Sequence, residues 1–468
     1  MSWIDEELKT VDLGDKRRAR RLGRILEDLT AQPEASVPQA SRDNASMQGT
    51  YEFWANVRIK AQEILQPHIE ATIERIKEHP IVLAIQDTTE LDFGKTQRIR
   101  KLGSLGHGEA KGLKVHTVLC STADGLPLGV LHQKTWTREN PRQGKGDQRR
   151  KQAIAEKESH RWLECLKVTQ ELVPPETKVV TVGDREADIF ELFATPRRSG
   201  SELLIRAAQN RNVKVKADTG EEELLFEALR KAPISGQVTL ELQRTPRRKA
   251  RAATLTVRWI KVELQPPTQH PQRKKLTGVR VWAILASEEN PPIRETPVSW
   301  LLLTTLSVNN FSGACECLRK YSKRWAIERF HYVLKSGCHL EELQLEEAQR
   351  IEKALATYCI VAWRLLWLTY QARVNPQQAA TVALEKAEWQ ALYCMIKKTP
   401  MPPAEPPTIS ECIRWIASLG GFLGRKCDGE PGVKTLWRGW QRLNDIALTW
   451  QLLTEALKES SLGEQMKE

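Results

Sequence analysis

The sequence lacks the patterns that mark secreted, membrane-spanning and zinc-binding proteins. Its 9 cysteines show no Cys-x-x-Cys spacing, and Cys315 and Cys317 are too close for the usual zinc knuckle, so we expect free thiols in a reducing compartment. The N-terminus is acidic where a signal peptide is basic and then apolar, and no apolar stretch reaches the uncharged length of a membrane helix. No internal repeat is present. These absences predict a cytoplasmic protein without membrane contact.

What the sequence does have is length and positive charge. A chain of 468 residues, of which 40% are hydrophobic, is too long for one core and predicts two or three domains. Lysine and arginine number 71 against 59 acidic residues, which gives a net charge of +12. This balance favours a polyanionic partner, with nucleic acid as the first candidate and a merely basic surface as the alternative.

One charged segment, residues 321–335, is predicted to be a helix with a polar face. At about 100° of rotation per residue, four polar side chains fall within roughly 60° of one another. They are Tyr321, Arg324, Glu328 and Lys335. A carboxylate among cations suits a nuclease in which the acid holds a metal ion and the bases hold the neighbouring phosphates. The alternative is a solvated helix whose charges form i,i+4 pairs.

Two aspartates each follow an apolar run that predicts a buried strand. Asp87 comes after a strand predicted at 81–85, and Asp184 comes after one at 178–182. An aspartate at the carboxyl end of a central strand projects into the crevice where open α/β sheets bind ligands, while a helix N-cap is the alternative for either residue alone. Together with Glu328 they predict three carboxylates around two divalent cations, Mg2+ with Mn2+ as a substitute.

These motifs resemble those of the DDE transposases of the insertion-sequence-four family. The likeness rests on the order Asp87, Asp184, Glu328, on Asp-Arg-Glu-Ala-Asp from residue 184, and on Tyr-x2-Arg-x3-Glu-x6-Lys from residue 321. It extends from Leu-Gly-Asp-Lys-Arg-Arg at 13–18 to Leu-Trp-Arg-Gly-Trp at 436–440. The resemblance implies that the three acids are the catalytic and metal-binding residues of a bacterial, nucleoid-associated enzyme that cuts out and reinserts a DNA element.

The resemblance also implies an order of reactions and roles for the flanking side chains. Water would free the transposon 3′ end, the 3′-OH would form a hairpin with the opposite strand, a second water would open it, and the 3′-OH would join target DNA. Tyr321, Arg324 and Lys335 would hold phosphate near the bend. In the family, a tryptophan 21 residues before the signature tyrosine stacks on a base flipped out in the hairpin, and Trp300 has this spacing. From composition alone, Trp300 is equally a core residue of a predicted strand.

The order of predicted elements indicates an α/β fold with a ribonuclease-H-like catalytic core. Three strands come first, at 81–85, 113–121 and 126–134, and a helix at 156–172 then leads to the strand at 178–182. We expect a helical N-terminal DNA-binding domain at 1–75, the catalytic domain at 76–372 with an inserted β subdomain at about 200–305, and a helical C-terminal dimerisation domain at 373–468.

Cations gather at the start of a helix that is predicted to begin at Lys16 and to be capped by Asp15. The helix dipole disfavours cations there unless phosphates neutralise them, which indicates contact with double-stranded DNA; an ordinary solvated basic helix is the alternative. A further basic segment, 139–151, is either a contact to the DNA backbone or a solvated loop, and the turn at 244–251 of the inserted β subdomain is also basic. The candidate contacts of the N-terminal domain are Arg17, Arg18 and, in a loop predicted at 32–44, Arg42.

The C-terminal region is predicted to be helical and to carry an unpartnered apolar face. The proline-rich segment 400–407 indicates a semi-rigid linker that marks a boundary. After it, Thr408 and Glu411 form a capping box. A helix predicted at 433–457 then carries an apolar face made of Leu436, Trp440, Leu443, Ala447 and Trp450. Because only two helices follow the linker, we expect this face to be buried on another surface. The family's C-terminal helices dimerise, so the resemblance implies a homodimer.

Two other functions stay open at this point. A structure-specific endonuclease of the same fold would hydrolyse DNA without joining it, although plain hydrolysis needs no hairpin support from Trp300. A DNA-binding regulator with a decayed site is the third candidate, and the presence of all three carboxylates disfavours it.

Overall fold

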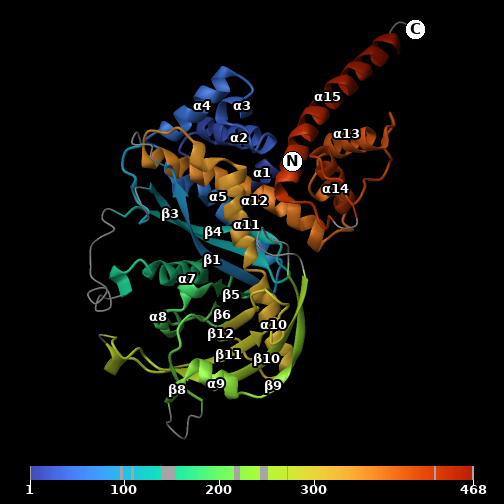
Figure 1. The fold of residues 1–468 in the computed structure, drawn as a ribbon. Helices are drawn as coiled ribbons and strands as arrows, with labels where there is room; N and C mark the ends of the chain where they lie inside the picture. Colours follow the sequence, from blue (N-terminus) through green and yellow to red (C-terminus); the bar gives the residue numbers. More distant parts are fainter. Residues whose placement is uncertain are drawn as a thin grey trace.

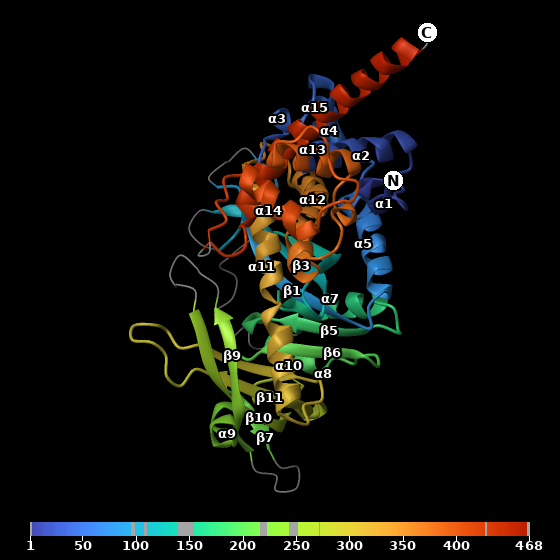
Figure 2. The same ribbon diagram turned by 90° about the vertical axis from the view of Figure 1, so that its right-hand side faces the viewer.

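A mixed sheet of 12 strands runs through the molecule. The N- and C-terminal helices lie at one end of it, and the strands from β7 to β11 lie at the other (Figures 1 and 2). The computed structural model describes residues 2–94, 99–106, 110–138, 154–215, 222–242, 251–270, 272–425 and 428–465. The basic segment 139–151 and residues 244–250 lie outside these ranges. In the described part of the chain no helix could span a membrane, and the cysteines there are free, as expected.

The centre of the sheet follows the predicted order of elements. β1 pairs antiparallel with β3 and parallel with β5, while β4 extends the sheet beyond β3 and β6 extends it beyond β5. The helix α7 (His160–Leu172) makes the crossover from β4 to β5. The strands of this centre are β1 (Ile81–Asp92), β3 (Lys111–Thr122), β4 (Pro127–Trp136), β5 (Lys178–Gly183) and β6 (Ser201–Arg206).

The strands that follow β6 continue the same sheet. β12 pairs with β6, and β11 and β10 follow in order, so the predicted insertion extends the catalytic sheet. The structure also places β6, which the sequence assigned to the insertion, in parallel pairing with β5. The added elements are β7 (Asn212–Lys214), β8 (Glu222–Leu224), α9 (Leu225–Lys231), β9 (Ile234–Leu242), β10 (Arg251–Leu264), β11 (Val279–Ser287) and β12 (Ser299–Thr304). Two short elements lie outside this series, β2 (Gly103–Ser104) and α8 (Phe190–Ala194).

Side chains on the two faces of β1 pack against different sets of helices. Val82 and Ala84 share a hydrophobic cluster with Cys165 of α7, whereas Leu83 and Ile85 share a cluster with the helices that carry the C-terminal half of the chain. Side chains alternate along a strand, so Asp87 points to the second layer and Thr88 points towards α7. This alternation separates the functional face of the sheet from its supporting face.

The N-terminal region is helical, as predicted, and forms five helices in its described residues. Asp15 caps α2 as expected, because its Oδ1 accepts a hydrogen bond from the backbone N–H of Arg17 at 2.8 Å. The loop predicted at 32–44 contains a short helix that begins after Ser36, since Ser36 and Gln39 form a capping box. The helices are α1 (Trp3–Glu7), α2 (Lys16–Ala31), α3 (Val37–Ala40), α4 (Asn44–Ala55) and α5 (Ala61–Lys77).

The prediction of one continuous helix from Tyr321 to Lys335 is wrong. The segment consists of α10 (Phe311–Ser322), α11 (Trp325–Tyr332) and a π-helical turn at Val333–Gly337. The break arises because the backbone N–H of Arg324 bonds to the carbonyl of Tyr321 at 3.0 Å, three residues back, which tightens the chain into a turn. The turn before α11 and the π-helical turn after it therefore change which of the four polar side chains lie together.

The C-terminal region is one packed unit of four helices. α13 precedes the proline-rich segment and α14 follows it, yet both lie in one hydrophobic cluster with Leu368 and Trp440, so the segment is not a boundary. Thr408 and Glu411 form the predicted capping box. The helices are α12 (Ala348–Val374), α13 (Lys386–Lys397), α14 (Ile409–Leu419) and α15 (Val433–Gln465).

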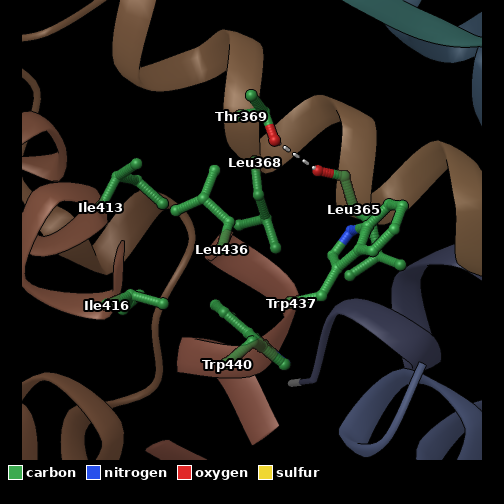
Figure 3. A pocket seen from close by; sticks show the side chains of 8 residues that line it. All are labelled: Leu365, Leu368, Thr369, Ile413, Ile416, Leu436, Trp437 and Trp440. Carbon is green, nitrogen blue, oxygen red and sulfur yellow. Dashed lines mark hydrogen bonds between the residues drawn. The ribbon is translucent and has the colours of Figure 1, made fainter. Parts of the chain in front are cut away.

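The predicted apolar face of α15 packs into the chain's own core, apart from Trp450, which is partly buried. Leu436 and Trp440 line a small apolar pocket with Ile413 of α14 and Leu365 of α12, so the expectation that this face covers another surface is wrong (Figure 3). Leu443 and Ala447 are also buried. Beyond them α15 projects away from the body, as both ribbon views show, and carries side chains that are each 60% exposed. These are Leu448, Leu452 and Leu453.

Candidate active site

The register of the sheet brings the two aspartates to the same level. The parallel pairing of β1 with β5 ends at Ile85 and Val182, and Asp87 and Asp184 each lie two residues further along their strands. Asp184 directly follows β5 as predicted. Asp87 does not end its strand as predicted, because β1 continues to Asp92 in antiparallel pairing with β3. At Asp87, β1 is therefore paired with β3 on one edge and has no pairing with β5 on the other edge.

Glu328 reaches this pair through a shared arginine. Arg324, in the turn that begins α11, places Nη1 3.7 Å from Oδ2 of Asp87 and contacts Oε1 of Glu328 with Nη2. Its side chain is only 9% exposed. Figure 1 shows α11 crossing over β1, the strand that carries Asp87. The break before α11 thus sets one guanidinium between two of the three predicted acids.

The charges at this point are not balanced. Burial and the negative charges of Asp184 and Glu328 together raise the pKa of Asp87 to about 7, because the Thr88 backbone N–H and Arg324 only partly oppose them. A buried carboxyl whose neighbours are carboxylates favours any added cation. Perturbed acids of this kind concentrate at functional sites.

An aromatic pair lies beside the acids. The rings of Trp300 and Tyr321 meet edge to face with centroids 5.4 Å apart and an interplanar angle of 71°. Trp300 is only partly buried, whereas Tyr321 is fully buried and its hydroxyl has no hydrogen-bond partner among the described residues. Burial raises the pKa of Tyr321, with Arg324 and Arg206 of β6 opposing the shift. The structure thus brings Trp300, Tyr321 and Arg324 together.

Lys335 lies apart from this group. Its Nζ donates to the carbonyl of Glu90 at 2.7 Å and approaches Oε1 of Glu341 at 3.0 Å. The π-helical turn carries it to a position three residues along β1 from Asp87. Lys335 is therefore at the edge of the site and does not share a face with Arg324 and Glu328.

The predicted N-terminal contacts have their own partners. Arg17 is exposed beside Asp15, and Nη1 of Arg18 donates to the carbonyl of Leu13 at 2.8 Å. Arg42 lies 3.3 Å from Asp28, and its side chain is largely exposed. These arginines contact the N-terminal helices and do not join the carboxylates.

Sequence reasoning missed one exposed aromatic at the site. Trp325 follows Arg324 directly, is 54% exposed, and has the Arg324 guanidinium 5.3 Å from its ring centroid. The sequence does carry a signal for this residue, because Trp325 directly follows Arg324 within the charged segment 321–335. Its face is available for stacking.

The three acids suit a divalent cation by chemistry, although they do not form a finished metal site. Within the described ranges, no group of three His, Cys, Asp or Glu side chains is close enough to hold a metal ion as it stands. Carboxylate oxygens are the ligands that Mg2+ and Mn2+ prefer, and the negative charges of Asp184 and Glu328 add to burial in raising the pKa of Asp87. Arg324 contacts both Asp87 and Glu328, so its guanidinium would have to move if a cation bound between these two carboxylates.

Comparison with known families covers most of the chain. Residues 1–59 match the transposase DNA-binding family, residues 87–364 match the transposase DDE domain, and residues 360–451 match the Tn5 transposase dimerisation domain. The DDE match covers more than half of the 468 residues. It implies a ribonuclease-H-like core, in agreement with the strand order of the sheet, and the use of a divalent metal. The chain therefore belongs to the Tn5-like DDE transposases, which are DNA-binding, dimerising and metal-dependent DNA-cleaving enzymes.

Proposed function

We propose that this transposase moves its element by a cut-and-paste reaction in which Asp87, Asp184 and Glu328 hold two divalent cations, Mg2+ with Mn2+ as a substitute. The observation that supports this best is the convergence of β1, the end of β5 and α11, where the pKa of Asp87 rises to about 7 because it is buried beside Asp184 and Glu328. When bound, two divalent cations activate the attacking oxygen and stabilise the leaving oxygen of an in-line displacement.

The protein's own side chains orient the reactants. The backbone N–H groups of Thr88 and Glu186 each donate to one aspartate, which fixes the carboxylates. Arg324 exchanges its carboxylate contacts for a contact to a phosphate oxygen. The hydroxyl of Tyr321 donates a hydrogen bond to the same phosphate. Lys335 holds a neighbouring phosphate from the edge of the site. One set of groups then serves 3′-end nicking, hairpin formation, hairpin opening and strand transfer, because each step is the same displacement at phosphorus.

Trp300 distinguishes a transposase from a nuclease of the same fold. Its partly buried indole meets the Tyr321 ring and keeps an exposed part, which suits it to stack on a base flipped out of the bent strand. The initial nick needs no flipped base. Trp300→Ala should therefore release the 3′ end normally and form hairpins poorly, with the defect eased when the flipping base is removed from the substrate. Denaturing gels of end-labelled DNA separate the two products, and equal loss of both would make Trp300 a core residue.

The flanking regions assemble the complex. We place the DNA-binding unit at 1–75, with Arg17, Arg18 and Arg42 on phosphates, the catalytic unit at 76–372, and the dimerisation unit at 373–468.

The exposed leucines of α15 beyond Ala447 form the surface that meets a second copy in the complex of two proteins and two ends. Leu448→Glu with Leu452→Glu should abolish paired-end complexes in native gels, whereas Thr449→Glu, an exposed neighbour, should not. Normal pairing by the leucine variant would move the contact elsewhere.

A cleavage and joining assay tests the proposed reaction. The protein is incubated with Mg2+, a duplex from the end of its own element and a target plasmid. A nick, a hairpin and a joined product are expected, and Asp184→Ala should yield none of them while still binding the end. Nicks without hairpins or joined products would indicate a structure-specific endonuclease instead.

A further inference from the structure

The two aspartates are oriented in the same way by their following residues. Oδ1 of Asp87 accepts a hydrogen bond from the backbone N–H of Thr88 at 2.8 Å, and Oδ1 of Asp184 accepts one from the backbone N–H of Glu186 at 2.8 Å. The direction of each carboxylate thus depends on where the next stretch of backbone lies. A side chain that fixes the positions of Thr88 and Glu186 therefore also fixes the carboxylates of Asp87 and Asp184.

A single buried arginine holds both of these residues. Arg161, the second residue of α7, donates from Nε to Oγ1 of Thr88 at 3.0 Å and from Nη2 to Oε2 of Glu186 at 2.6 Å. It is 8% exposed. We propose that Arg161 is the positioning residue that fixes the two aspartates relative to each other, by joining Thr88 on β1 to Glu186 after β5. This inference rests on the proposed roles of Asp87 and Asp184.

Arg161 works from the supporting face of the sheet. Thr88 points towards α7 while Asp87 points the opposite way, so the guanidinium does not reach the DNA side. It is held there on three sides, by a bond from Nη1 to the carbonyl of Glu158 at 2.9 Å and by the rings of Trp136 and Trp162, whose centroids are 5.6 and 5.5 Å away. A planar fork can bind two separate acceptors at once, which a lysine ammonium at the same place does poorly.

The hydrogen bonds around Thr88 leave it one orientation. Its Oγ1 accepts from Arg161 and lies 2.8 Å from Nδ1 of His116, so the hydroxyl proton must point to that nitrogen. Burial and the charge of Arg161 keep the pKa of His116 well below its ordinary value, so the ring is neutral and its other nitrogen donates to Oε1 of Gln86 at 3.2 Å. The chain of hydrogen bonds from Arg161 through Thr88 to His116 and Gln86 therefore has one direction.

Paired substitutions test the inference on the full-length protein. Arg161→Met and Thr88→Val should each lower the rate of Mg2+-dependent nicking by about 10- to 100-fold, the range found when partners of metal ligands are removed. Thr88→Ser keeps the hydroxyl and should restore most of the rate, and Arg161→Lys should recover less. The double variant Arg161→Met with Thr88→Val should be about as slow as Arg161→Met alone, because both act through one contact.

Arg198→Met is the matched control. Arg198 donates to the carbonyls of Val173, Pro174 and Thr177 at the opposite end of β5, so its loss costs packing without touching the aspartates. A second measurement avoids catalysis: Mn2+ alone is titrated into the protein bound to its DNA end and followed by electron paramagnetic resonance. We expect about 10-fold weaker Mn2+ binding in Arg161→Met and Thr88→Val, wild-type binding in Arg198→Met, and unchanged affinity for DNA in all variants.

The outcomes separate this inference from the proposed site. If Asp184→Ala nicks normally, the site assignment itself fails. If Asp184→Ala is inactive while Arg161→Met nicks and binds Mn2+ as the wild type does, only the positioning role is wrong. Should Arg161→Met melt before assay, the Thr88→Val and Thr88→Ser pair decides, and equal rates in those two variants would overturn the inference.

Discussion

The cluster around Glu7 and the cluster around Asp87 both combine a buried carboxylate with arginine, and they differ in one respect. At the junction of α1, α5 and β4, Glu7 is 2% exposed and accepts Arg75 Nη1 at 2.9 Å, Arg75 Nη2 at 3.2 Å and a contact from Nδ1 of His68. Burial raises its pKa, but His68 and Arg75 outweigh burial and keep the value below the ordinary range. In the active site, the pKa of Asp87 instead rises to about 7.

The difference is whether the protein supplies enough positive partners. The junction cluster is closed, because the second ring nitrogen of His68 also accepts the backbone N–H of Val130 at 2.9 Å. Such a cluster holds elements together, and removing one member leaves a buried charge unpaired. The active-site cluster has three acids and one shared arginine, so it is open to an added cation. Closed clusters stabilise a fold, whereas open ones mark a site.

The largest effect should come from deleting an acid of the open cluster. Asp87→Ala, Asp184→Ala and Glu328→Ala should each slow strand cleavage by more than about a thousandfold, or ~4 kcal/mol, because each removes a metal ligand. Affinity for the transposon end should stay largely intact, since it depends on phosphate contacts made elsewhere. Cleavage is measured on denaturing gels and binding by mobility shift, and a variant that cut near the wild-type rate would lose its assigned role.

The closed cluster should respond in stability and not in chemistry. Glu7→Gln should lower the free energy of unfolding by about 3 kcal/mol, because it leaves Arg75 without its counter-charge and His68 without the carboxylate that its Nδ1 contacts. Glu6→Gln changes an exposed acid on the same helix and should have almost no effect. Urea denaturation of the three proteins provides the comparison. Equal urea midpoints in the three proteins would show that the junction cluster does not stabilise the fold.

Acid should destabilise the junction. Burial lowers the pKa of His68 in the folded protein, so below about pH 6.5 the unfolded chain takes up a proton that the folded chain does not. Stability should therefore fall as pH drops from 7 to 5, by up to ~1.4 kcal/mol per pH unit for this group. His68→Asn is expected to be less stable throughout but to show a shallower slope. An unchanged slope would mean that other groups control acid unfolding.

The smallest effect has the opposite sign. Asp87→Asn removes a buried acid whose neighbours repel it, so without divalent cations it should raise the free energy of unfolding at pH 8 by on the order of 1 kcal/mol. The gain should shrink as the pH falls below about 7, the pKa of Asp87 in the folded protein, and should be nearly gone at pH 4, near the ordinary pKa of an aspartate in the unfolded chain. Thermal unfolding in chelator at the two pH values is the measurement, and destabilisation at pH 8 would show that Asp87 is structurally paired.

Local patterns in the sequence predicted local structure well. The cap at Asp15, the capping box at Thr408 and the strands leading to Asp87 and Asp184 depend on neighbours within a few residues, and the structure has them. The break at Arg324 was missed, because helical periodicity continues across it and only three-residue hydrogen bonds reveal the turn.

Pairings between distant residues could not be inferred in the same way. β1 extends to Asp92 because β3 pairs along its whole length, and the predicted apolar face of α15 is buried against α12 and α14. Arg161 was missed for a related reason. Its two acceptors, Thr88 and Glu186, lie far apart in the chain and meet only through the sheet register.

Iron-directed cleavage of the protein backbone tests most directly whether the three acids share one metal site. Fe2+ replaces Mg2+ in the complex with a transposon end, and ascorbate with peroxide then generates radicals that cut the nearest peptide bonds. We predict three sets of cuts, near Asp87, Asp184 and Glu328, which excess Mg2+ suppresses and which are lost in Asp184→Ala. Cuts that cluster elsewhere, or cuts that persist unchanged in Asp184→Ala, would contradict a site formed by these carboxylates.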